Sequence, residues 1–303
     1  MNFQPSDLEY VHCDFCGADD ATKRYEKRGF NMVQCNKCGL VYTNPRLKME
    51  KIAALYDADY FQGHGFDKSI DYVKDVTEHT SKDDFTLEDW DIENIRTLLQ
   101  RNSTFRIQNA KLLEVGCGTG VFLDKARKHR FDVHGIELSD YAANFVRQMG
   151  IPVETKPIED ANFAPGSFDA IVMREVIEHL PHPLESLKTV YSWLKPGGVL
   201  FMATGNYDCP ERKLKGADWF YFMPEGHLTI FSNTTMTNYL KKVGFSHVNV
   251  TNQGDKLMDM LRNWGVIHKG EARPKNILHK AVFGLVRSVN HFISSGMRIY
   301  AVK

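Results

Sequence analysis

The sequence predicts an α/β fold, a Rossmann-like doubly wound parallel sheet, preceded by a small four-cysteine module. Three observations predict it. Short apolar strands alternate with amphipathic helices over residues 111–205, a glycine-rich loop follows the first of these strands, and two C-x-x-C pairs lie near the N-terminus. Alternating strands and helices are typical of a parallel sheet that helices cover on both faces.

Composition indicates a globular protein without a dedicated electrostatic partner. The 303 residues suffice for one large α/β domain and a small module, and 43% are apolar. Lys plus Arg equals Asp plus Glu at 38 each, which disfavours a nucleic-acid binder but leaves room for a local basic patch. Neither a signal segment nor a membrane-spanning apolar run is evident, so we expect a cytoplasmic protein.

The first module carries CDFCG at 13–17 and CNKCG at 35–39, with each pair followed by glycine. Glycine permits the positive φ that turns two amides toward the thiolates. Four thiolates suit tetrahedral Zn²⁺ and leave no open coordination position, so the predicted zinc is structural. The alternative is a redox dithiol or unligated thiols. The predicted metal ligands are Cys13, Cys16, Cys35 and Cys38.

We divide the chain into a zinc ribbon (1–48), a helical linker or cap (49–110) and a main domain (111–303). Within the main domain, the aromatic-rich loop 206–231 is a predicted lid over the acceptor, and 256–296 is a predicted helical insertion. Residues 276–293 repeat apolar positions on one helical face. That helix packs on the domain or makes peripheral contact with a membrane surface or a partner.

The order of elements in the main domain follows from periodicity and capping residues. Ser139 and Gly150 bracket one helix, and Ser232 or Asn233 and Gly244 bracket another. The expected strands are 111–115, 131–138, 151–155, 168–173, 199–206, 245–251 and 299–303, and the expected helices are 121–129, 139–150, 183–194 and 232–243.

The glycine-rich loop LLEVGCGTG spans residues 112–120. Its spacing, Gly116-x-Gly118-x-Gly120, is one residue shorter than the dinucleotide fingerprint, and no Lys follows as a P-loop requires. The loop amides and the helix N-terminus behind them favour a carboxylate or hydroxyl-rich ligand close to the backbone.

Two acids complete this pattern. Glu114 precedes the loop and can only accept hydrogen bonds, so it suits a ligand ammonium or a chain of waters. Glu137 ends the next strand, where an acid binds ribose hydroxyls. Together they call for a ligand with an amino acid at one end and a ribose at the other, and S-adenosylmethionine (SAM) has both.

With these motifs the chain resembles the class I SAM-dependent methyltransferases. The residues that carry the resemblance are LEVGCGTG (113–120), the acid of GIELS, FDAIVMREVIEHLPHP (168–183) and KPGGVLFMATGN (195–206). The resemblance extends to bacterial methyltransferases of surface-polysaccharide and antibiotic-sugar pathways, through the four cysteines and the runs CGLVYTNP, YDADYF and GHLTIFS. Sugar C-methyltransferases of that group have a Glu-His pair where this chain has Gly226-His227, and they carry a further C-terminal domain, so C-methylation is disfavoured.

The resemblance implies where the cofactor lies. Glu159, or its neighbour Asp160, follows the third strand and would bind the adenine amino group, unless both are solvated loop acids. Tyr56, Tyr60 and Phe61 would roof the sulfonium by cation–π contact, or pack under the zinc module. The predicted cofactor-binding residues are Glu114, Gly116, Cys117, Gly118, Gly120, Glu137, Leu138, Glu159, Arg174, Glu175 and Tyr60.

The predicted catalytic residues are His179 and His227, since a hydroxyl or carbon-acid acceptor needs a base. The alternatives are that His179 shapes a turn and that His227 anchors the lid. Glu178 and Glu225 orient these rings or are ordinary carboxylates. The lid aromatics Trp219, Phe220, Tyr221 and Phe222 stack on an acceptor or form a plain hydrophobic lid.

The sequence therefore predicts a SAM-dependent methyltransferase acting on a small-molecule acceptor, at a hydroxyl of a sugar, glycan precursor or related metabolite. An rRNA or other RNA methyltransferase is the alternative, with Lys23, Arg24, Lys27, Arg28 and Lys37 as a basic face on the ribbon. A sugar C-methyltransferase and a SAM-binding scaffold without turnover are further alternatives.

Overall fold

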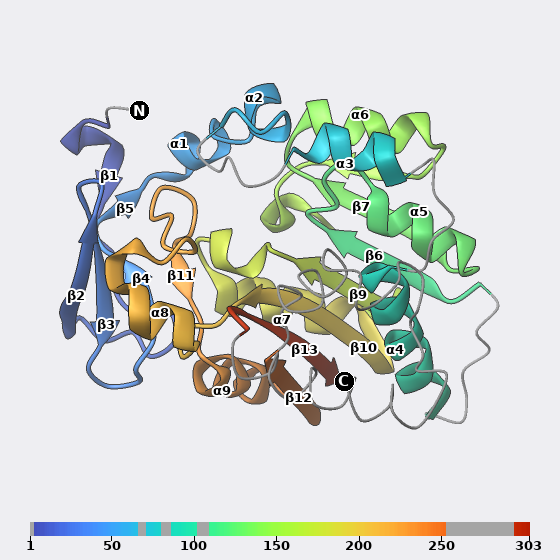
Figure 1. Ribbon diagram of the computed structural model, residues 1–303. Helices are drawn as coiled ribbons and strands as arrows, with labels where there is room; N and C mark the ends of the chain where they lie inside the picture. The colour runs from blue at the N-terminus through green and yellow to red at the C-terminus, as the bar shows by residue number, and fades with distance from the viewer. Residues whose placement is uncertain (1–2, 66–70, 80–85, 102–108, 253–293) are drawn as a thin grey trace, which may run out of the picture.

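The structure is a computed structural model that describes residues 3–65, 71–79, 86–101, 109–252 and 294–303 (Figure 1). The predicted helix 276–293, and all of the predicted insertion except residues 294–296, lie outside the described residues. Within the described part of the chain, no helix is both long enough and apolar enough to cross a membrane.

A seven-stranded sheet forms the centre of the molecule, in the order β12-β13-β10-β9-β6-β7-β8. The strands β6 to β10 pair in parallel, and β13 runs antiparallel to both of its neighbours. The predicted doubly wound fold is confirmed. The strands are β6 (Lys111–Val115), β7 (Asp132–Glu137), β8 (Val153–Thr155), β9 (Phe168–Arg174), β10 (Leu194–Gly205), β12 (His247–Asn252) and β13 (Gly296–Val302).

Helices cover both faces of this sheet because its strands are apolar on both sides. On β6, Leu112 packs in one hydrophobic cluster, whereas Leu113 packs in the other. The first cluster contains residues of α4 (Leu87–Arg101), α5 (Val121–Lys128) and α6 (Asp140–Gln148). The second contains residues of α7 (Pro183–Trp193) and α9 (Asn233–Val243), together with ribbon residues.

The predicted helix ends are confirmed for two helices. The α6 helix follows Ser139, and Gly150 beyond its end has φ +72°. The α9 helix starts with a reciprocal pair, in which Ser232 Oγ accepts from the Thr235 amide and Thr235 Oγ1 accepts from the Ser232 amide. It ends at Gly244, whose φ of +118° few other residues adopt.

The zinc-ribbon region and the lid share one sheet, ordered β11-β4-β3-β2 (Figure 1, left). Region 206–231 is therefore not one long loop, because it contains α8, η4 and the edge strand β11. The elements are β2 (Ala21–Lys27), β3 (Phe30–Cys35), β4 (Val41–Thr43), α8 (Pro210–Lys215), η4 (Gly216–Asp218) and β11 (Thr229–Ile230). The remaining ones are η1 (Pro5–Asp7), β1 (Leu8–Glu9), β5 (Arg46–Leu47), α1 (Met49–Ala53), α2 (Ala58–Phe61), α3 (Tyr72–His79), η2 (Ile158–Asp160) and η3 (Ile177–His179).

The ribbon is also bound directly to the main domain. Asp14, between the first two cysteines, accepts hydrogen bonds from the Leu184 amide of α7 and from the Tyr239 hydroxyl of α9, both at 3.0 Å. The Lys242 ammonium lies 4.6 Å from the centre of the Phe15 ring. The loop that carries the first cysteine pair is therefore held on two helices of the main domain.

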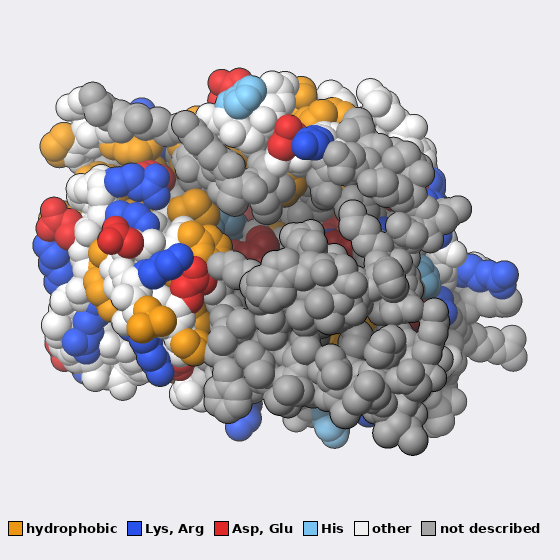
Figure 2. All heavy atoms as spheres, in the orientation of Figure 1, with side chains coloured by type: hydrophobic (Ala, Val, Ile, Leu, Met, Phe, Trp, Pro, Cys, Tyr) orange, Lys and Arg blue, Asp and Glu red, His pale blue; other side chains and the backbone are white. Residues whose placement is uncertain are grey.

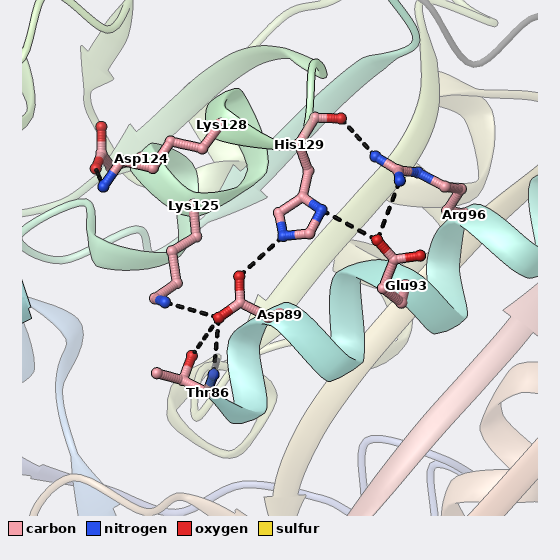
Figure 3. A network of polar contacts seen from close by, with 8 residues as sticks. All are labelled: Thr86, Asp89, Glu93, Arg96, Asp124, Lys125, Lys128 and His129. Atoms are coloured by element: carbon pink, nitrogen blue, oxygen red, sulfur yellow. Dashed lines mark hydrogen bonds and ion pairs between the residues drawn. The ribbon is translucent and has the colours of Figure 1, made fainter. Parts of the chain in front are cut away.

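A polar network fixes the start of α4 against α5 (Figure 3). Asp89 accepts from the Thr86 amide at 2.8 Å, in the manner of a capping box, and from Lys125 Nζ at 2.7 Å. The His129 ring lies between Asp89 and Glu93, with nitrogen–oxygen distances of 2.9 and 3.1 Å. These contacts hold the first turn of α4 at the carboxyl end of the central strands.

Candidate active site

The order of strands reverses between β6 and β9, and ligands of open α/β sheets bind where the order reverses, at the carboxyl ends of the strands. The glycine-rich loop follows β6 at this place. Gly116 has φ +67°, and a Cβ on it would lie 2.5 Å from Val176 Cγ2. Gly118 and Gly120 also have positive φ, at +52° and +86°. A side chain at Gly116 would collide with Val176, and the positive φ values disfavour side chains at all three glycines.

Glu114, at the end of β6, is a buried acid with one oxygen that has no hydrogen-bond partner among the described residues. This oxygen, Oε2, is itself buried. Burial raises the pKa of Glu114 to about 8, although the charge of nearby Arg174 opposes the shift. A buried acceptor without a donor is rare in native proteins, and a ligand ammonium would satisfy it.

Glu137, at the end of β7, is held in one orientation by the backbone. Its Oε2 accepts from the Gly118 amide at 2.8 Å, and its Oε1 accepts from the Ser139 amide at 2.9 Å. Each carboxylate oxygen keeps a second lone pair, which suits the two hydroxyls of a ribose. Leu138 beside it is half-buried, whereas Glu159 and Asp160 in η2 are exposed.

Arg174 ends β9 and lies among acids. Its guanidinium is 3.0 Å from Glu88 Oε1 on α4 and stacks over the Phe122 ring at 5.2 Å. The negative charges of Glu88 and Glu114 raise its pKa, against the effect of burial. This cation stands beside the unpartnered Glu114, so the pair matches an amino acid, with its ammonium toward Glu114 and its carboxylate toward Arg174.

An aromatic cluster lies over the glycine loop. Tyr60 and Phe61 of α2 are buried and pack with Ala142 of α6. A Cβ built on Gly118 would lie 4.0 Å from Phe61 Cε1, so the cluster borders the loop directly. The Tyr56 ring meets the Tyr60 ring edge-on, with centroids 4.9 Å apart. The cluster thus packs at the border of the glycine loop, and a roof over the sulfonium stays a prediction.

The two predicted histidines meet. Their ring centroids are 4.7 Å apart, although one ring follows β9 and the other belongs to the lid. His227 Nδ1 is 2.8 Å from the Tyr221 carbonyl oxygen, and His179 Nδ1 is 2.9 Å from the Gly226 carbonyl oxygen. Since a carbonyl only accepts, each Nδ1 carries a proton. Burial, and then nearby His179, lower the pKa of His227 well below its ordinary value, so this ring is neutral.

The hydroxyl of Tyr56 lies 2.7 Å from His179 Nδ1. The Nδ1 proton of His179 therefore has two acceptors, the Tyr56 hydroxyl and the Gly226 carbonyl oxygen. Tyr56 thereby connects the aromatic cluster over the glycine loop with the histidine pair. The predicted cofactor region and the predicted catalytic residues are thus parts of one site.

Two carboxyl groups border the histidines. Tyr221 donates its hydroxyl proton to Glu178 Oε1, and the same hydroxyl lies 3.0 Å from Glu175 Oε2. Thr204 Oγ1 donates to Glu178 Oε2 at 2.9 Å. Glu178 is fully buried, and its pKa is raised chiefly by that burial. Glu175 has φ +51°, a conformation few residues other than glycine adopt.

Glu175 is exposed to solvent, although many protein atoms lie around its carboxyl group. Its surroundings and the charge of Glu178 raise its pKa to about 8. Figure 2 shows acidic side chains at the bottom of a hollow near the middle of the view. The contacts above bring these acids and the two histidines together, and Tyr56 links them to the aromatic cluster by the glycine loop.

Sequence reasoning missed Glu88 and Thr204. Glu88 is one of several acids in the first turn of α4, and nothing local distinguishes it. Thr204 is a polar residue near the end of an otherwise apolar strand, directly before Gly205, and that contrast is a usable signal.

The aromatic side chains of the lid differ in role, because some pack against the ribbon sheet and one contacts the carboxyl groups of the site. Trp219 and Phe222 are fully buried with Met32 and Val41 of the ribbon sheet, so they form a hydrophobic lid, and Phe220 is 44% exposed. Among the four, Tyr221 reaches the carboxyl groups. Glu225 pairs with the ribbon, because its Oε1 is bound by Arg28 Nε at 3.0 Å. Cys117 is buried in the loop, and Cys209 accepts from the Arg212 amide at the start of α8.

The four N-terminal cysteines converge. The four sulfur atoms lie within 4.8 Å of one another. The sulfurs of Cys13 and Cys38 are 3.4 Å apart, and those of Cys16 and Cys35 are 3.5 Å apart. Tetrahedral zinc with Zn–S bonds of about 2.3 Å requires sulfurs roughly 3.8 Å apart, so four thiolates in this array fit the ion. Both following glycines have positive φ, and each donates its amide to the carbonyl of the first cysteine of its pair.

The two cysteine turns face the predicted metal position, and their surroundings change the pKa values of the thiols. Although burial opposes its ionisation, the amides of Cys38 and Lys37 lower the pKa of Cys35 to about 7, whereas burial raises the pKa of Cys13. All four are free thiols, as the zinc prediction requires and a disulfide would exclude.

Comparison with known proteins gives relatives in the main domain. A ubiquinone biosynthesis O-methyltransferase of Xanthomonas campestris pv. campestris is 34% identical over 107 residues, 33% of this chain and 45% of that protein. One from Coxiella burnetii is 31% identical over 129 residues, 40% of this chain and 55% of that protein. This chain spans about half the length of the curated relatives it matches.

A solved structure confirms the fold. The plantazolicin methyltransferase BpumL, in complex with a triazolic desmethylPZN analog and S-adenosylhomocysteine (SAH), superposes with a TM-score of 0.51 at 13% identity. The alignment covers 84% of this chain and 99% of BpumL. The model of the methyltransferase-domain family matches residues 87–250, more than half of the chain. The chain therefore belongs to the methyltransferase-domain family.

Proposed function

We propose that the protein methylates a hydroxyl oxygen of a small-molecule acceptor, namely a sugar, a glycan precursor or a related metabolite. One observation carries the proposal: the acid–imidazole cluster of Glu175, Glu178, His179 and His227 beside the glycine loop. A hydroxyl is a weak nucleophile and must lose its proton during transfer, and such a cluster supplies acceptors for that proton. The matched relatives are named O-methyltransferases, which supports oxygen as the nucleophile.

The residues around the glycine loop would hold SAM, which supplies a methyl group on a sulfonium. The unpartnered Glu114 Oε2 suits the ammonium, and Arg174 suits the carboxylate. Glu137 suits the ribose because the Gly118 and Ser139 amides fix its direction. Tyr60 and Phe61 exclude water from the side of the loop where they pack.

Cys13, Cys16, Cys35 and Cys38 would hold a structural Zn²⁺. The ion would stiffen β3 and β4, and β4 pairs with β11 of the lid, Tyr42 with Thr229 and Val41 with Ile230. The Thr43 hydroxyl donates to the His227 carbonyl at 3.1 Å. The ribbon therefore supports the segment that carries the acceptor-side histidine.

The ribbon contacts disfavour the RNA alternative. Lys27 Nζ donates to the Trp219 carbonyl at 3.1 Å, and Arg28 binds Glu225. Lys23 binds Glu26, and Arg24 Nε donates to Gln34 Oε1. Four of the five basic side chains thus have partners within the protein, and two of these partners belong to the lid.

The test is a transfer assay with SAM labelled on its methyl group. Purified protein is offered total RNA and, separately, small-molecule and lipid-linked glycan extracts. We expect label in a small-molecule or glycan pool, strongly reduced in His227→Ala and unchanged in His247→Ala, whose ring is exposed on β12. Mass spectrometry and NMR of the isolated product locate the methyl group, and a methyl group on oxygen is the expected result. Label confined to RNA, or to a carbon or nitrogen atom of the acceptor, would contradict the proposal.

A further inference from the structure

Three potential metal ligands converge away from the cysteine cluster. Glu178, His179 and His227 each place one donor atom within 4.8 Å of the other two. Glu178 is fully buried and His227 is 4% exposed, so this is not a chance meeting of surface side chains. Two ligands come from η3 and the third comes from the lid, 48 residues beyond His179 by the numbering of the chain.

Glu175 lies beside this group of three. It lies one turn before Glu178, and both carboxyl groups contact the hydroxyl of Tyr221. A phenol has a single proton, so it cannot donate to both carboxylates at once. Two carboxyl groups held this close oppose each other's ionisation. A divalent cation between them would favour the ionised form of both.

Both histidines are oriented as metal ligands usually are. Each Nδ1–H donates to a backbone carbonyl, that of Tyr221 for His227 and that of Gly226 for His179. Such a hydrogen bond fixes the tautomer and directs the Nε2 lone pair of a metal-bound histidine. The hydroxyls of Thr204 and Tyr221 fix Glu178 in the same way. The cluster therefore has an ordered outer shell of the kind that metal sites need.

We propose that Glu175, Glu178, His179 and His227 bind one divalent cation of the Mn²⁺ class at the acceptor side of the site. Two carboxylates and two imidazoles are oxygen and nitrogen donors without a thiolate, which favours Mn²⁺, Mg²⁺, Fe²⁺ or Co²⁺ over the soft-ligand chemistry of the four cysteines. The protein would then hold two different ions, one structural and one at the site of transfer.

The role of this ion rests on the proposed hydroxyl acceptor. A hydroxyl bound to a divalent cation loses its proton more readily, and here the proton would pass to water. The oxygen lone pair then forms the O–CH₃ bond while the S–CH₃ bond breaks with its electron pair staying on sulfur, giving methylated acceptor and SAH. With the ion bound, His227 would serve as a ligand, and activation of the hydroxyl by the ion would replace proton acceptance by the cluster itself.

The experiment is a Mn²⁺ titration followed by electron paramagnetic resonance, on full-length protein that keeps one Zn²⁺ per chain in the ribbon after a mild chelator has removed any other metal, because Zn²⁺ would outcompete Mn²⁺ at the proposed site. We expect one Mn²⁺ per chain, with the affinity at least about tenfold lower in Glu175→Gln, Glu178→Gln and His227→Ala. His134→Ala is the matched control, since His134 also lies near a carboxylate, 3.5 Å from Glu154, but far from the cluster in the fold. Circular dichroism checks that each variant is folded.

Equal Mn²⁺ affinity in the folded variants, or no Mn²⁺ bound to the wild type below about 1 mM, would overturn the site. If His227→Ala fails to fold, the nearly isosteric Glu175→Gln and Glu178→Gln decide the question. Transfer assays with and without Mn²⁺ separate the two proposals. If a chelator leaves the rate of hydroxyl methylation unchanged, the role of the ion is rejected and the proposed function stands. If Mn²⁺ binds but no hydroxyl is methylated, the metal site stands and the proposed function is rejected.

Discussion

Gly205, the last residue of β10, lies directly against the ring of Tyr221. A Cβ added to Gly205 would meet Tyr221 Cε1 at 2.2 Å and Cδ1 at 2.4 Å, closer than any real contact of such atoms. The absence of a side chain at the end of this strand is what allows the lid tyrosine to reach Glu175 and Glu178.

Gly205→Ala should therefore displace Tyr221 from the carboxyl groups. We expect a loss of roughly 1–3 kcal/mol in the free energy of unfolding, as overpacked cores show, and a marked fall in methyl transfer. Urea unfolding and the transfer assay measure the two effects. A double-mutant cycle with Tyr221→Ala is the control: if the clash is the cause, adding Gly205→Ala to Tyr221→Ala costs little more. Additive losses would show that Gly205 acts independently of Tyr221.

Glu114→Gln should weaken SAM binding. The variant keeps the size of the side chain but removes the charge that its unpartnered Oε2 offers to the ammonium. A hydrogen bond to a charged group contributes about 1.5–3 kcal/mol, so we expect a Kd roughly 10- to 100-fold higher by calorimetry. Glu185→Gln, at an exposed position on α7, should leave the Kd unchanged. An unchanged Kd in Glu114→Gln would remove Glu114 from the cofactor site.

The affinity for SAM should rise with pH up to about 8. Burial raises the pKa of Glu114 from 4.5 to about 8, so the free protein binds a proton there that SAM must displace. Because the folded-state pKa is the higher one, ionisation of Glu114 costs free-protein stability as the pH rises from about 4.5 through 8. SAM should offset that loss, so the thermal shift caused by SAM should grow over this range. Glu114→Gln should flatten the dependence, and a dependence of the same size in the variant would assign it to another group.

Asp89→Asn should destabilise the whole protein rather than the site alone. Lys125 is nearly buried and would lose its anionic partner, and breaking such pairs costs about 3–5 kcal/mol. Glu93→Gln is the matched control, because Glu93 contacts the same His129 ring but its side chain is 43% exposed, and there we expect about 1 kcal/mol or less. Urea unfolding of both variants measures the difference, and equal losses would contradict the network in Figure 3.

Asp89 should also contribute to unfolding of the protein in acid. Burial opposes the ionisation of Asp89, but the bonds from Lys125, Thr86 and His129 outweigh it and lower its pKa from 3.8 to about 2. The folded-state pKa is the lower one, so this stabilisation is complete above about 3.8 and is lost as the pH falls toward 2. In Asp89→Asn the free energy of unfolding should depend less steeply on pH over that interval.

Cys35→Ser should lose the zinc and loosen the lid. We expect one Zn²⁺ per chain by elemental analysis of the wild type, and less in the variant, together with a lower Tm and weaker methyl transfer, because the ribbon sheet includes β11. Cys209→Ser keeps an acceptor for the Arg212 amide and should retain the metal. One full equivalent of zinc in folded Cys35→Ser would contradict a four-cysteine site.

Features that depend on neighbours in the chain could be predicted from the sequence. The alternation of strands and helices, the ends of α6 and α9 at Ser139, Gly150, Ser232 and Gly244, and the glycine loop after β6 are local patterns, and the structure contains them. The two cysteine pairs were recognisable because each repeats one short turn. The region 206–231 was predicted less well, since a two-residue edge strand carries almost no periodicity of its own.

By itself the sequence determined the fold class, the place of the cofactor loop and the four-cysteine module, because periodicity, capping residues and short-range spacing specify them. Only the tertiary structure decided which groups meet at the site. His179 reaches the Gly226 carbonyl 47 residues away, Arg174 reaches Glu88 across 86, and Thr43 reaches the His227 carbonyl across 184. Contacts over such separations arise when the sheet, the ribbon and the lid pack together, and packing leaves no repeating signal in the sequence.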